Sequence, residues 1–166
     1  MQVDSKTVEQ MLERMQTQLA PLCKADPDVV MIGIKTGGVL VGDALHKALG
    51  ITSELGQLNI SFYRDDFSTV GLHPVVGPSQ LPSSVDNKHI ILVDDVLSTG
   101  RTVRAAMNEI FDYGRPARIT LAVLVQRNGH ELPIRADVFG ESMEVNESDH
   151  IKLNTDPWSI DIETRA

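Results

Sequence analysis

The sequence has a single cysteine, Cys23, so no disulfide bond can form within the chain. It has no apolar run that approaches the roughly 20 residues of a membrane-spanning helix. The first residues lack the charged start and apolar run of a secretory signal, so we expect a cytoplasmic protein without membrane contact. Neither Cys23 nor the five histidines show the spacing of zinc ligands, which disfavours a zinc site.

Positive charge is also scarce. Lysine and arginine number 15 against 23 acidic residues, which gives a formal net charge of −8. The last 30 residues, 137–166, hold eight of the acidic residues and have only Lys152 and Arg165 as cations. Residues 101–135 instead carry six arginines and three acidic residues. This modestly basic stretch suits a small anionic ligand better than a long polyanion such as RNA, which calls for a strongly basic face.

The chain length predicts one domain, residues 1–166. Three continuous apolar runs are typical of strands buried on both faces of a sheet. They cover residues 29–34, 89–93 and 119–125. Apolar residues at helical spacing predict three helices, over residues 5–22, 39–49 and 101–113. This alternation predicts an α/β fold with a parallel sheet covered by helices on both faces, whose ligands gather at the carboxyl ends of the strands.

The segment 90–102 has the most informative pattern. An apolar strand is followed by Asp94 and Asp95, and then by a hydroxyl-rich turn, residues 98–102, that opens a helix. The carboxylates can accept hydrogen bonds from vicinal ribose hydroxyls, and the turn offers N–H groups and hydroxyls to a phosphate at the helix N-terminus. Although the aspartates alone would also suit a helix cap, this context favours a site for phosphoribosyl diphosphate (PRPP). The pair could also bind Mg²⁺, which would arrive with the diphosphate.

A second candidate anion loop, Lys-Thr-Gly-Gly at residues 35–38, follows the first apolar run. Glycine permits close backbone approach, and Lys35 adds a positive charge beside a diphosphate. The alternative interpretation is a simple turn before a helix. The loop matches neither the Walker A pattern nor the dinucleotide fingerprint, which disfavours an ATPase and a dehydrogenase.

Residues 58–62 alternate apolar and polar side chains, which predicts a half-exposed strand. The stretch that follows, residues 63–88, has three prolines and two glycines and no regular period. A loop of this length in a compact domain is usually functional, so we expect a flexible lid. At its base, Arg64 beside Tyr63 could bring a cation onto a leaving diphosphate; alternatively it faces solvent, paired with a neighbouring aspartate.

Six segments together resemble the PyrR family of type I phosphoribosyltransferases, which are pyrimidine operon regulators and uracil phosphoribosyltransferases. They are residues 33–38, 63–66, 91–106, 114–117, 121–125 and 131–137. The resemblance implies the type I phosphoribosyltransferase fold, with a long flexible lid loop and a small hood. The core would span about residues 27–126, and the hood about residues 127–153 plus the N-terminal helix.

The resemblance also implies roles for individual residues. Asp94 and Asp95 would hold the ribose hydroxyls and be candidate metal ligands, with Mg²⁺ bound together with PRPP. Thr36 and Gly37 would form the diphosphate loop through a non-proline cis peptide, and Arg127 would lie in the hood over the base. The implied catalytic residues are Arg64, Asp94 and Asp95. The implied PRPP or nucleotide contacts are Lys35, Thr36, Gly37, Gly38, Tyr63, Asp94, Asp95, Val96, Leu97, Ser98, Thr99, Gly100, Arg101 and Thr102.

The implied reaction transfers the phosphoribosyl group from PRPP to uracil and gives UMP and diphosphate, a step of pyrimidine salvage. We assign no general base, because Ser98 stands where some purine-specific relatives have an acid. The implied partners are PRPP, uracil, UMP and further copies of the chain, as a dimer or an assembly of dimers.

The alternative function is a nucleotide-responsive, RNA-binding attenuator of pyrimidine biosynthesis genes, with or without catalytic activity. A nucleotide sensor with neither activity, and a purine as the accepted base, are further alternatives. Two segments depart from the family. Residues 126–130 read Gln-Arg-Asn-Gly-His instead of an acid followed by Arg-Gly-His-Arg, and the first helix carries few cations.

Overall fold

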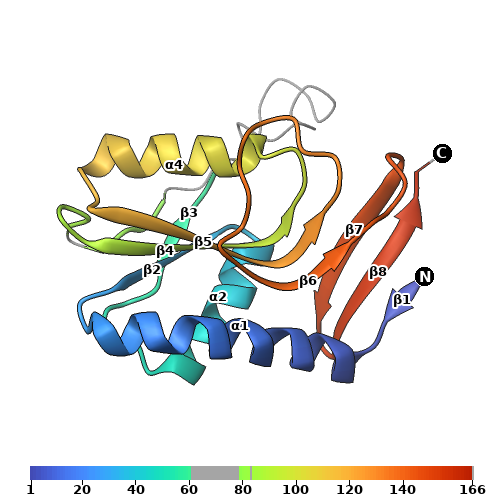
Figure 1. Cartoon of the computed structure of the whole chain (residues 1–166), viewed down its shortest axis with the longest axis horizontal. Helices are drawn as coiled ribbons and strands as arrows, with labels where there is room; N and C mark the ends of the chain where they lie inside the picture. The colour runs from blue at the N-terminus through green and yellow to red at the C-terminus, as the bar shows by residue number, and fades with distance from the viewer. Residues whose placement is uncertain (61–78, 83, 166) are drawn as a thin grey trace.

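A computed structural model describes residues 1–60, 79–82 and 84–165 of the chain, and its strands form two sheets (Figure 1). The larger sheet has the strand order β3-β2-β4-β5-β6 and is parallel throughout. Its strands are β2 (Val30–Ile34), β3 (Gly56–Leu58), β4 (His89–Leu97), β5 (Arg118–Arg127) and β6 (Val138–Met143). The predicted α/β fold with a parallel sheet is confirmed.

In the described part of the chain, three helices cover this sheet. They are α1 (Ser5–Ala25), α2 (Gly37–Leu49) and α4 (Arg101–Tyr113). Successive strand residues point to opposite faces and so build two cores. Met31, Ile91 and Val93 pack on the face of α1 and α2, whereas Ile32 and Leu92 pack on the face of α4. Figure 1 shows α4 on one side of the sheet and α1 and α2 on the other, as predicted.

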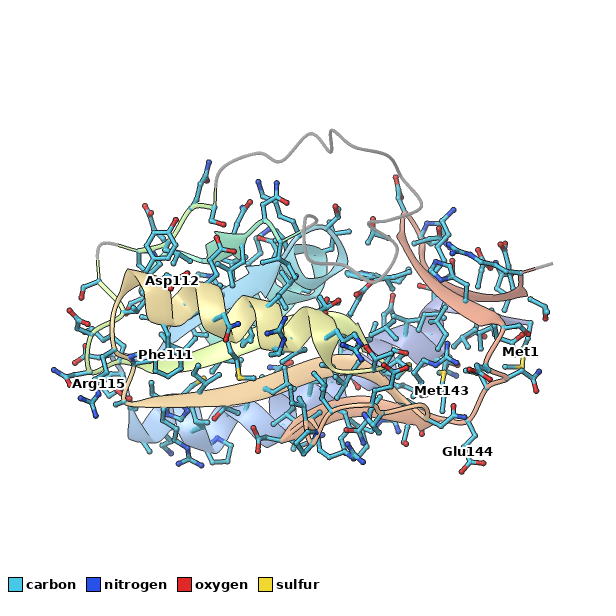
Figure 2. All side chains as sticks on the ribbon, turned by 90° about the horizontal axis from the view of Figure 1, so that it is seen from above. Met1, Phe111, Asp112, Arg115, Met143 and Glu144 are labelled. Atoms are coloured by element: carbon cyan, nitrogen blue, oxygen red, sulfur yellow. The ribbon has the colours of Figure 1, made fainter. Side chains whose placement is uncertain are left out.

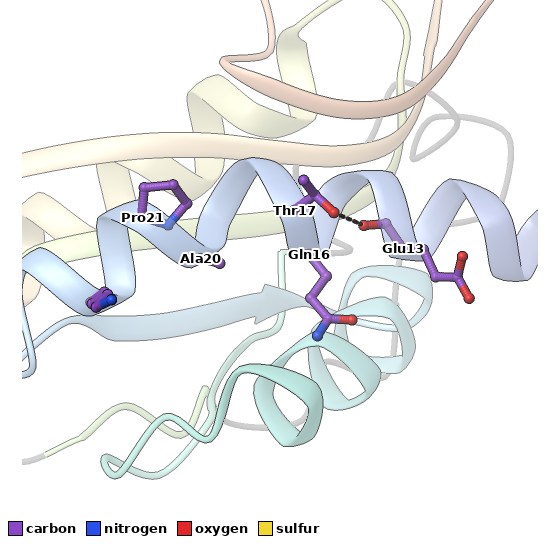
Figure 3. A pocket seen from close by; sticks show the side chains of 6 residues that line it. Glu13, Gln16, Thr17, Ala20 and Pro21 are labelled. Atoms are coloured by element: carbon purple, nitrogen blue, oxygen red, sulfur yellow. Dashed lines mark hydrogen bonds between the residues drawn. The ribbon is translucent and has the colours of Figure 1, made fainter.

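Helix α1 is longer than predicted, because it ends at Ala25 rather than at residue 22. Pro21 lies inside it and has no N–H to donate to the carbonyl four residues earlier. The helix nevertheless continues, since Leu19 is fully buried in the core and the N–H of Asp26 closes the last turn on the carbonyl of Leu22. Figure 3 shows Pro21 on the exposed side of this helix, one turn beyond Thr17.

Two strands also differ from their predicted bounds. Strand β4 continues through the acidic pair to Leu97, because residues 94, 96 and 97 pair with β5 as the apolar residues before them do. Asp94 and Asp95 therefore lie inside the strand rather than after it. Strand β3 is Gly56–Leu58 instead of residues 58–62, although burial alternates from Gly56 to Ile60. Most of the predicted lid, residues 63–88, lies outside the described residues.

A second, antiparallel sheet was not predicted. It has the order β1-β8-β7 and consists of β1 (Gln2–Val3), β7 (Asp149–Thr155) and β8 (Trp158–Thr164). Helix α1 contacts both β6 and β8 and so joins the two sheets. In Figure 2, Met1 and Met143 lie at one end of the molecule, and Phe111 at the C-terminal end of α4 lies at the other. The division into a core and a hood at these boundaries stays a prediction.

Within the described ranges, no helix is both long enough and apolar enough to cross a membrane.

Candidate functional site

A pocket of about 460 Å³ lies where α2 and α4 begin, at the carboxyl ends of β2 and β4. Strands β5 and β7 and the C-terminal end of the chain contribute the opposite wall. The lining residues are Thr36, Gly37, Leu40, Asp94, Asp95, Val96, Ser98, Thr102, Arg127, His150, Ile151, Lys152, Leu153 and Arg165. The pocket thus joins two segments that are about sixty residues apart in the sequence, the 35–38 loop and the 94–102 motif.

Gly37 is packed directly against the acidic pair. A Cβ atom built on Gly37 would overlap Oδ2 and Cγ of Asp95 and lie 2.9 Å from its Cβ. No side chain fits between them, so a glycine is required for the loop to approach the carboxylate this closely. The peptide bond between Lys35 and Thr36 is cis, which confirms the non-proline cis peptide expected in this loop. The N–H of Lys35 donates to the carbonyl of Leu58 at 2.8 Å and ties the loop to β3.

The two carboxylates are oriented by the backbone of β4. Asp94 is 3% exposed, and its Oδ1 accepts a hydrogen bond from the N–H of Asp95 at 2.9 Å. Asp95 Oδ1 accepts from the N–H of Val96, also at 2.9 Å. A bond from a peptide N–H restrains a short carboxylate at a buried site and stabilises its charge. The pair is therefore held in a defined orientation.

The 98–102 loop connects β4 to α4. Gly100 is the N-cap residue and has a φ of 96°, in the left-handed region that glycine adopts without a steric penalty. The N–H of Arg101 donates to Thr99 Oγ1 at 3.2 Å, and no side chain caps α4. The first N–H groups of a helix have no partner within the helix and carry its positive partial charge. Ser98 and Thr102 of this loop line the pocket, so the loop can receive an anion there.

Arg127, the last residue of β5, lines the pocket and braces its opposite wall. Its Nη1 donates to the carbonyl of Asp149 at 2.7 Å, and its Nη2 donates to the carbonyl of Asn146 at 3.0 Å. Nε donates to the carbonyl of Asn128 at 3.3 Å. The guanidinium group thereby fixes the start of β7 against the end of β5.

Sequence reasoning missed the contribution of β7 and the C-terminal residues to the site. His150, Lys152 and Arg165 line the pocket although they belong to the acidic tail, residues 137–166. A signal was present, because Lys152 and Arg165 are the tail's only two lysine or arginine residues. Cations retained in an acidic segment point to an anionic ligand.

Six predicted site residues belong to the described part of the chain without lining the pocket: Lys35, Gly38, Leu97, Thr99, Gly100 and Arg101. Gly38 is the second residue of α2, and Leu97 is buried at the end of β4. Thr99 and Gly100 lie between β4 and α4, and Arg101 is the first residue of α4. Tyr63 and Arg64 lie outside the described residues. Among the described residues, no group of three or more histidine, cysteine, aspartate or glutamate side chains could hold a metal ion. The ligand-binding roles of all these residues stay predictions.

A second hollow lies on the exposed face of α1 (Figure 3). It is lined by Glu13, Gln16, Thr17, Ala20, Pro21 and Lys24. All of these residues belong to one helix, and none of them is a predicted site residue. Among the residues that the structure describes, no strand end or loop lines this hollow, so it does not compete with the pocket at the strand ends.

Comparisons with known proteins agree with the fold. Residues 6–157 match the family model described as the phosphoribosyl transferase domain. Among solved structures, the hypoxanthine phosphoribosyl transferase of Trypanosoma cruzi superimposes with a TM-score of 0.68 at 18% identity, over 87% of this chain and 77% of that one. The purine phosphoribosyltransferase of Pyrococcus horikoshii superimposes with a TM-score of 0.60 at 24% identity, over 81% and 86%. At these identities the structures show a shared fold. The family model covers most of the chain, which therefore belongs to the phosphoribosyltransferases.

Curated relatives show to which family of phosphoribosyltransferases the chain belongs. The Bifunctional protein PyrR of Nitrosococcus oceani is 58% identical over 136 residues, 80% of this chain and 77% of the relative. The Bifunctional protein PyrR of Pseudomonas syringae pv. tomato is 47% identical over 160 residues, 96% of this chain and 93% of the relative. Within the phosphoribosyltransferases, the chain belongs to the PyrR family.

Proposed function

We propose that the chain transfers the phosphoribosyl group of PRPP to uracil and forms UMP and diphosphate. The observation that carries this proposal is the close packing of Gly37 against the side chain of Asp95. It places the candidate diphosphate loop directly beside the candidate ribose site in one pocket. In PRPP the diphosphate on C1 is next to the C2 hydroxyl of the ribose, so the groups that bind them must be neighbours. Membership of the PyrR family, whose resemblance implies transfer to uracil, supports a pyrimidine as the accepted base.

In this proposal the ribose, the 5-phosphate and the diphosphate of PRPP bind to three different parts of the pocket. The carboxylates of Asp94 and Asp95 accept hydrogen bonds from the ribose hydroxyls, and the 98–102 loop receives the 5-phosphate. The 35–38 loop receives the diphosphate, whose charge Lys35 helps to balance. The uracil then lies against the opposite wall, where β7 contributes His150 and Lys152. Tyr63 and Arg64 are proposed to act on the diphosphate, as expected from the sequence.

Asp94 and Asp95 also fit Mg²⁺. Carboxylate oxygens are its preferred protein ligands, but two of them leave most of an octahedral shell to waters and substrate oxygens. We therefore propose that the ion binds with PRPP, beside the carboxylates, and supplies positive charge to the diphosphate oxygens. The chain's own residues hold the sugar and the leaving group.

The reaction forms a bond between a uracil ring nitrogen and the ribose C1 and breaks the bond from C1 to the diphosphate oxygen. The proton of the ring nitrogen passes to the leaving diphosphate or to water. Positive charge develops on the ribose ring as negative charge builds on the leaving group. The pocket contributes by aligning both reactants and by stabilising the leaving diphosphate with backbone N–H groups and cations. Arg127 acts here through the wall that it braces, because its guanidinium group donates to three backbone carbonyls.

A regulatory function is the second candidate, because the curated PyrR relatives carry the name bifunctional. In this candidate a nucleotide in the same pocket would control binding of pyrimidine-gene RNA. The net charge of −8 works against association with a polyanion, so we rank it second. RNA binding that strengthens with UMP and weakens steeply with salt would support it, and salt-independent or absent binding would remove it. Assembly into dimers and a cytoplasmic location stay predictions.

The test of the enzymatic proposal is release of diphosphate from PRPP, with Mg²⁺ and a panel of pyrimidine and purine bases. We expect turnover with uracil and a large loss in the Asp95→Asn variant. Asp43→Asn is a matched control, since Asp43 forms an exposed ion pair with Lys47 on α2 and lies outside the pocket lining. Release with a purine only would overturn the assignment of uracil. No release with any base would overturn the enzymatic proposal.

A further inference from the structure

The segment 130–134 packs directly on the loop that is proposed to hold the 5-phosphate. The N–H groups of Glu131 and Leu132 both donate to the carbonyl of Thr99, at 3.0 and 3.1 Å. The side-chain carboxylate Oε2 of Glu131 accepts from Nε of Arg101 at 2.9 Å and lies 2.9 Å from its Nη2. Three contacts of hydrogen-bonding length therefore join one glutamate to the loop.

These contacts fix the direction of the peptide between Thr99 and Gly100. This peptide is trans, because the cis bonds of the described chain lie elsewhere. In a trans peptide the C=O and the N–H point in opposite directions. With the Thr99 carbonyl held toward residues 131 and 132, the Gly100 N–H points to the other side of the loop. It makes no hydrogen bond within the described part of the chain, and Ser98 and Thr102 of the same loop line the pocket.

The packing leaves the loop little freedom to turn over. A Cβ atom on Gly100 would lie 3.3 Å from Cβ of Leu132 and 3.4 Å from Cβ of Ile134, so these side chains cover the glycine closely. The ring of His130 lies beside the backbone of Ser98. Burial, and then the charge of Arg135, lowers the pKa of His130 below its ordinary value.

We propose that Glu131 is a positioning residue for the 5-phosphate of PRPP. Through Arg101 and the Thr99 carbonyl it holds the 98–102 loop with its N–H groups turned toward the phosphate, without touching the substrate. We call these contacts of Glu131 with Arg101 and with the Thr99 carbonyl the brace. The Arg101 side chain is part of this brace rather than a phosphate ligand. This inference rests on the proposed function, because it takes the loop to be the site of the 5-phosphate.

The test compares Glu131→Gln and Arg101→Gln with the double variant. Because an exposed ion pair contributes up to about 1 kcal/mol, we expect each single change to raise the KM for PRPP by up to about fivefold, with kcat and the KM for uracil unchanged. The double variant should be no worse than the single ones, since both remove the same brace. If Arg101 instead bound the phosphate and Glu131 masked it, Glu131→Gln would lower the KM for PRPP, which would overturn the proposal.

Two inhibitors show which part of PRPP is bound more weakly in Glu131→Gln. Ribose 5-phosphate carries the phosphate assigned to this loop, and inorganic diphosphate does not. The inhibition constant of ribose 5-phosphate should rise in Glu131→Gln, whereas that of diphosphate should stay at the wild-type value. Equal changes in both constants would point to a general structural defect and contradict a positioning role.

The chain offers a matched control in the pair Arg14 and Glu141. Nη1 of Arg14 lies 2.9 Å from Oε2 of Glu141, the same distance as between Arg101 Nη2 and Glu131 Oε2. The side chains of the control pair are 48% and 41% exposed, against 50% and 54% for Arg101 and Glu131. Neither residue lines the pocket. Glu141→Gln should leave every constant unchanged, and its unfolding temperature should match that of Glu131→Gln. An equal rise in the KM for PRPP in Glu141→Gln would overturn the proposal.

Calorimetric binding of ribose 5-phosphate separates this inference from the proposed function. If the wild-type chain releases no diphosphate but binds ribose 5-phosphate more tightly than Glu131→Gln does, the proposed reaction is wrong and the positioning role of Glu131 is supported. If the wild-type chain is active and Glu131→Gln binds ribose 5-phosphate equally well, the brace is wrong and the reaction stands.

Discussion

We expect the Gly37→Ala substitution to impair the use of PRPP because the new methyl group would overlap the carboxylate of Asp95. The φ of Gly37 is not in the left-handed region, so alanine itself causes no backbone strain and the effect is purely steric. To admit the methyl group, the Asp95 carboxylate must turn away from its hydrogen bond with the Val96 N–H. The loop must also shift slightly from β4, because Asp95 Cβ would lie only 2.9 Å from the methyl carbon. It then no longer presents its carboxylate to the ribose.

The size of the effect on catalysis follows from the loss of one hydrogen bond, from a ribose hydroxyl to the charged carboxylate of Asp95. Such a bond contributes roughly 1.5 to 3 kcal/mol. At about 1.4 kcal/mol for each factor of ten, its loss lowers kcat/KM for PRPP by about 10- to 150-fold. The assay is diphosphate release against PRPP concentration at saturating uracil. If Asp95 carries the effect, Gly37→Ala combined with Asp95→Asn should lose no more than the worse of the two single variants.

The control for this prediction is Gly42→Ala in the same helix. A Cβ atom at Gly42 would lie 3.4 Å from Cδ1 of Leu55, which is an ordinary contact, so activity should stay at the wild-type level. Two results would contradict the steric effect. One is wild-type kcat/KM in Gly37→Ala, and the other is an equal loss in Gly42→Ala, which would mean that any change in α2 is harmful.

Two further predictions concern stability. Met15 is fully buried in the core beneath α1, so Met15→Ala should lower the free energy of unfolding by about 2 to 5 kcal/mol in urea titrations. A change no larger than that of Gln16→Ala on the outer side would contradict this packing. Burial lowers the pKa of His89 below 6.5, so the unfolded chain binds its proton first and stability should fall as the pH drops below about 6.5 and through the lowered folded pKa. His89→Gln should flatten this part of the pH profile of unfolding, and an unchanged profile would exclude the cause.

The parallel sheet and the pocket at the carboxyl ends of its strands were predictable because their signals are local and strong. Continuous apolar runs identified β2, β4 and β5, and the Gly50 stop placed the end of α2 correctly at Leu49. The acidic pair was wrongly placed beyond β4. Aspartate is unfavourable in most strands, but here the pairing with β5 continues past it and the backbone N–H groups satisfy its carboxylates. Tertiary context outweighed residue preference at these two positions.

The wall formed by β7 was not predictable in the same way. Its burial is mixed, with Ile151 buried and Lys152 exposed, so the strand gives no long apolar run. The charge count of the tail did contain the information, because Lys152 and Arg165 both reach the pocket. The extension of α1 beyond Pro21 depends on the burial of Leu19 against the sheet, a contact that local sequence rules do not see.

One pocket is proposed to hold PRPP, with its 5-phosphate on the 98–102 loop and its diphosphate on the 35–38 loop. The decisive experiment is a crystal structure of the chain with PRPP and Mg²⁺, grown without a base. We predict the 5-phosphate at the start of α4, the ribose hydroxyls on Asp94 and Asp95, and the diphosphate beside Gly37. PRPP bound in the reverse orientation, or on another surface of the chain, would overturn the assignment of these two loops.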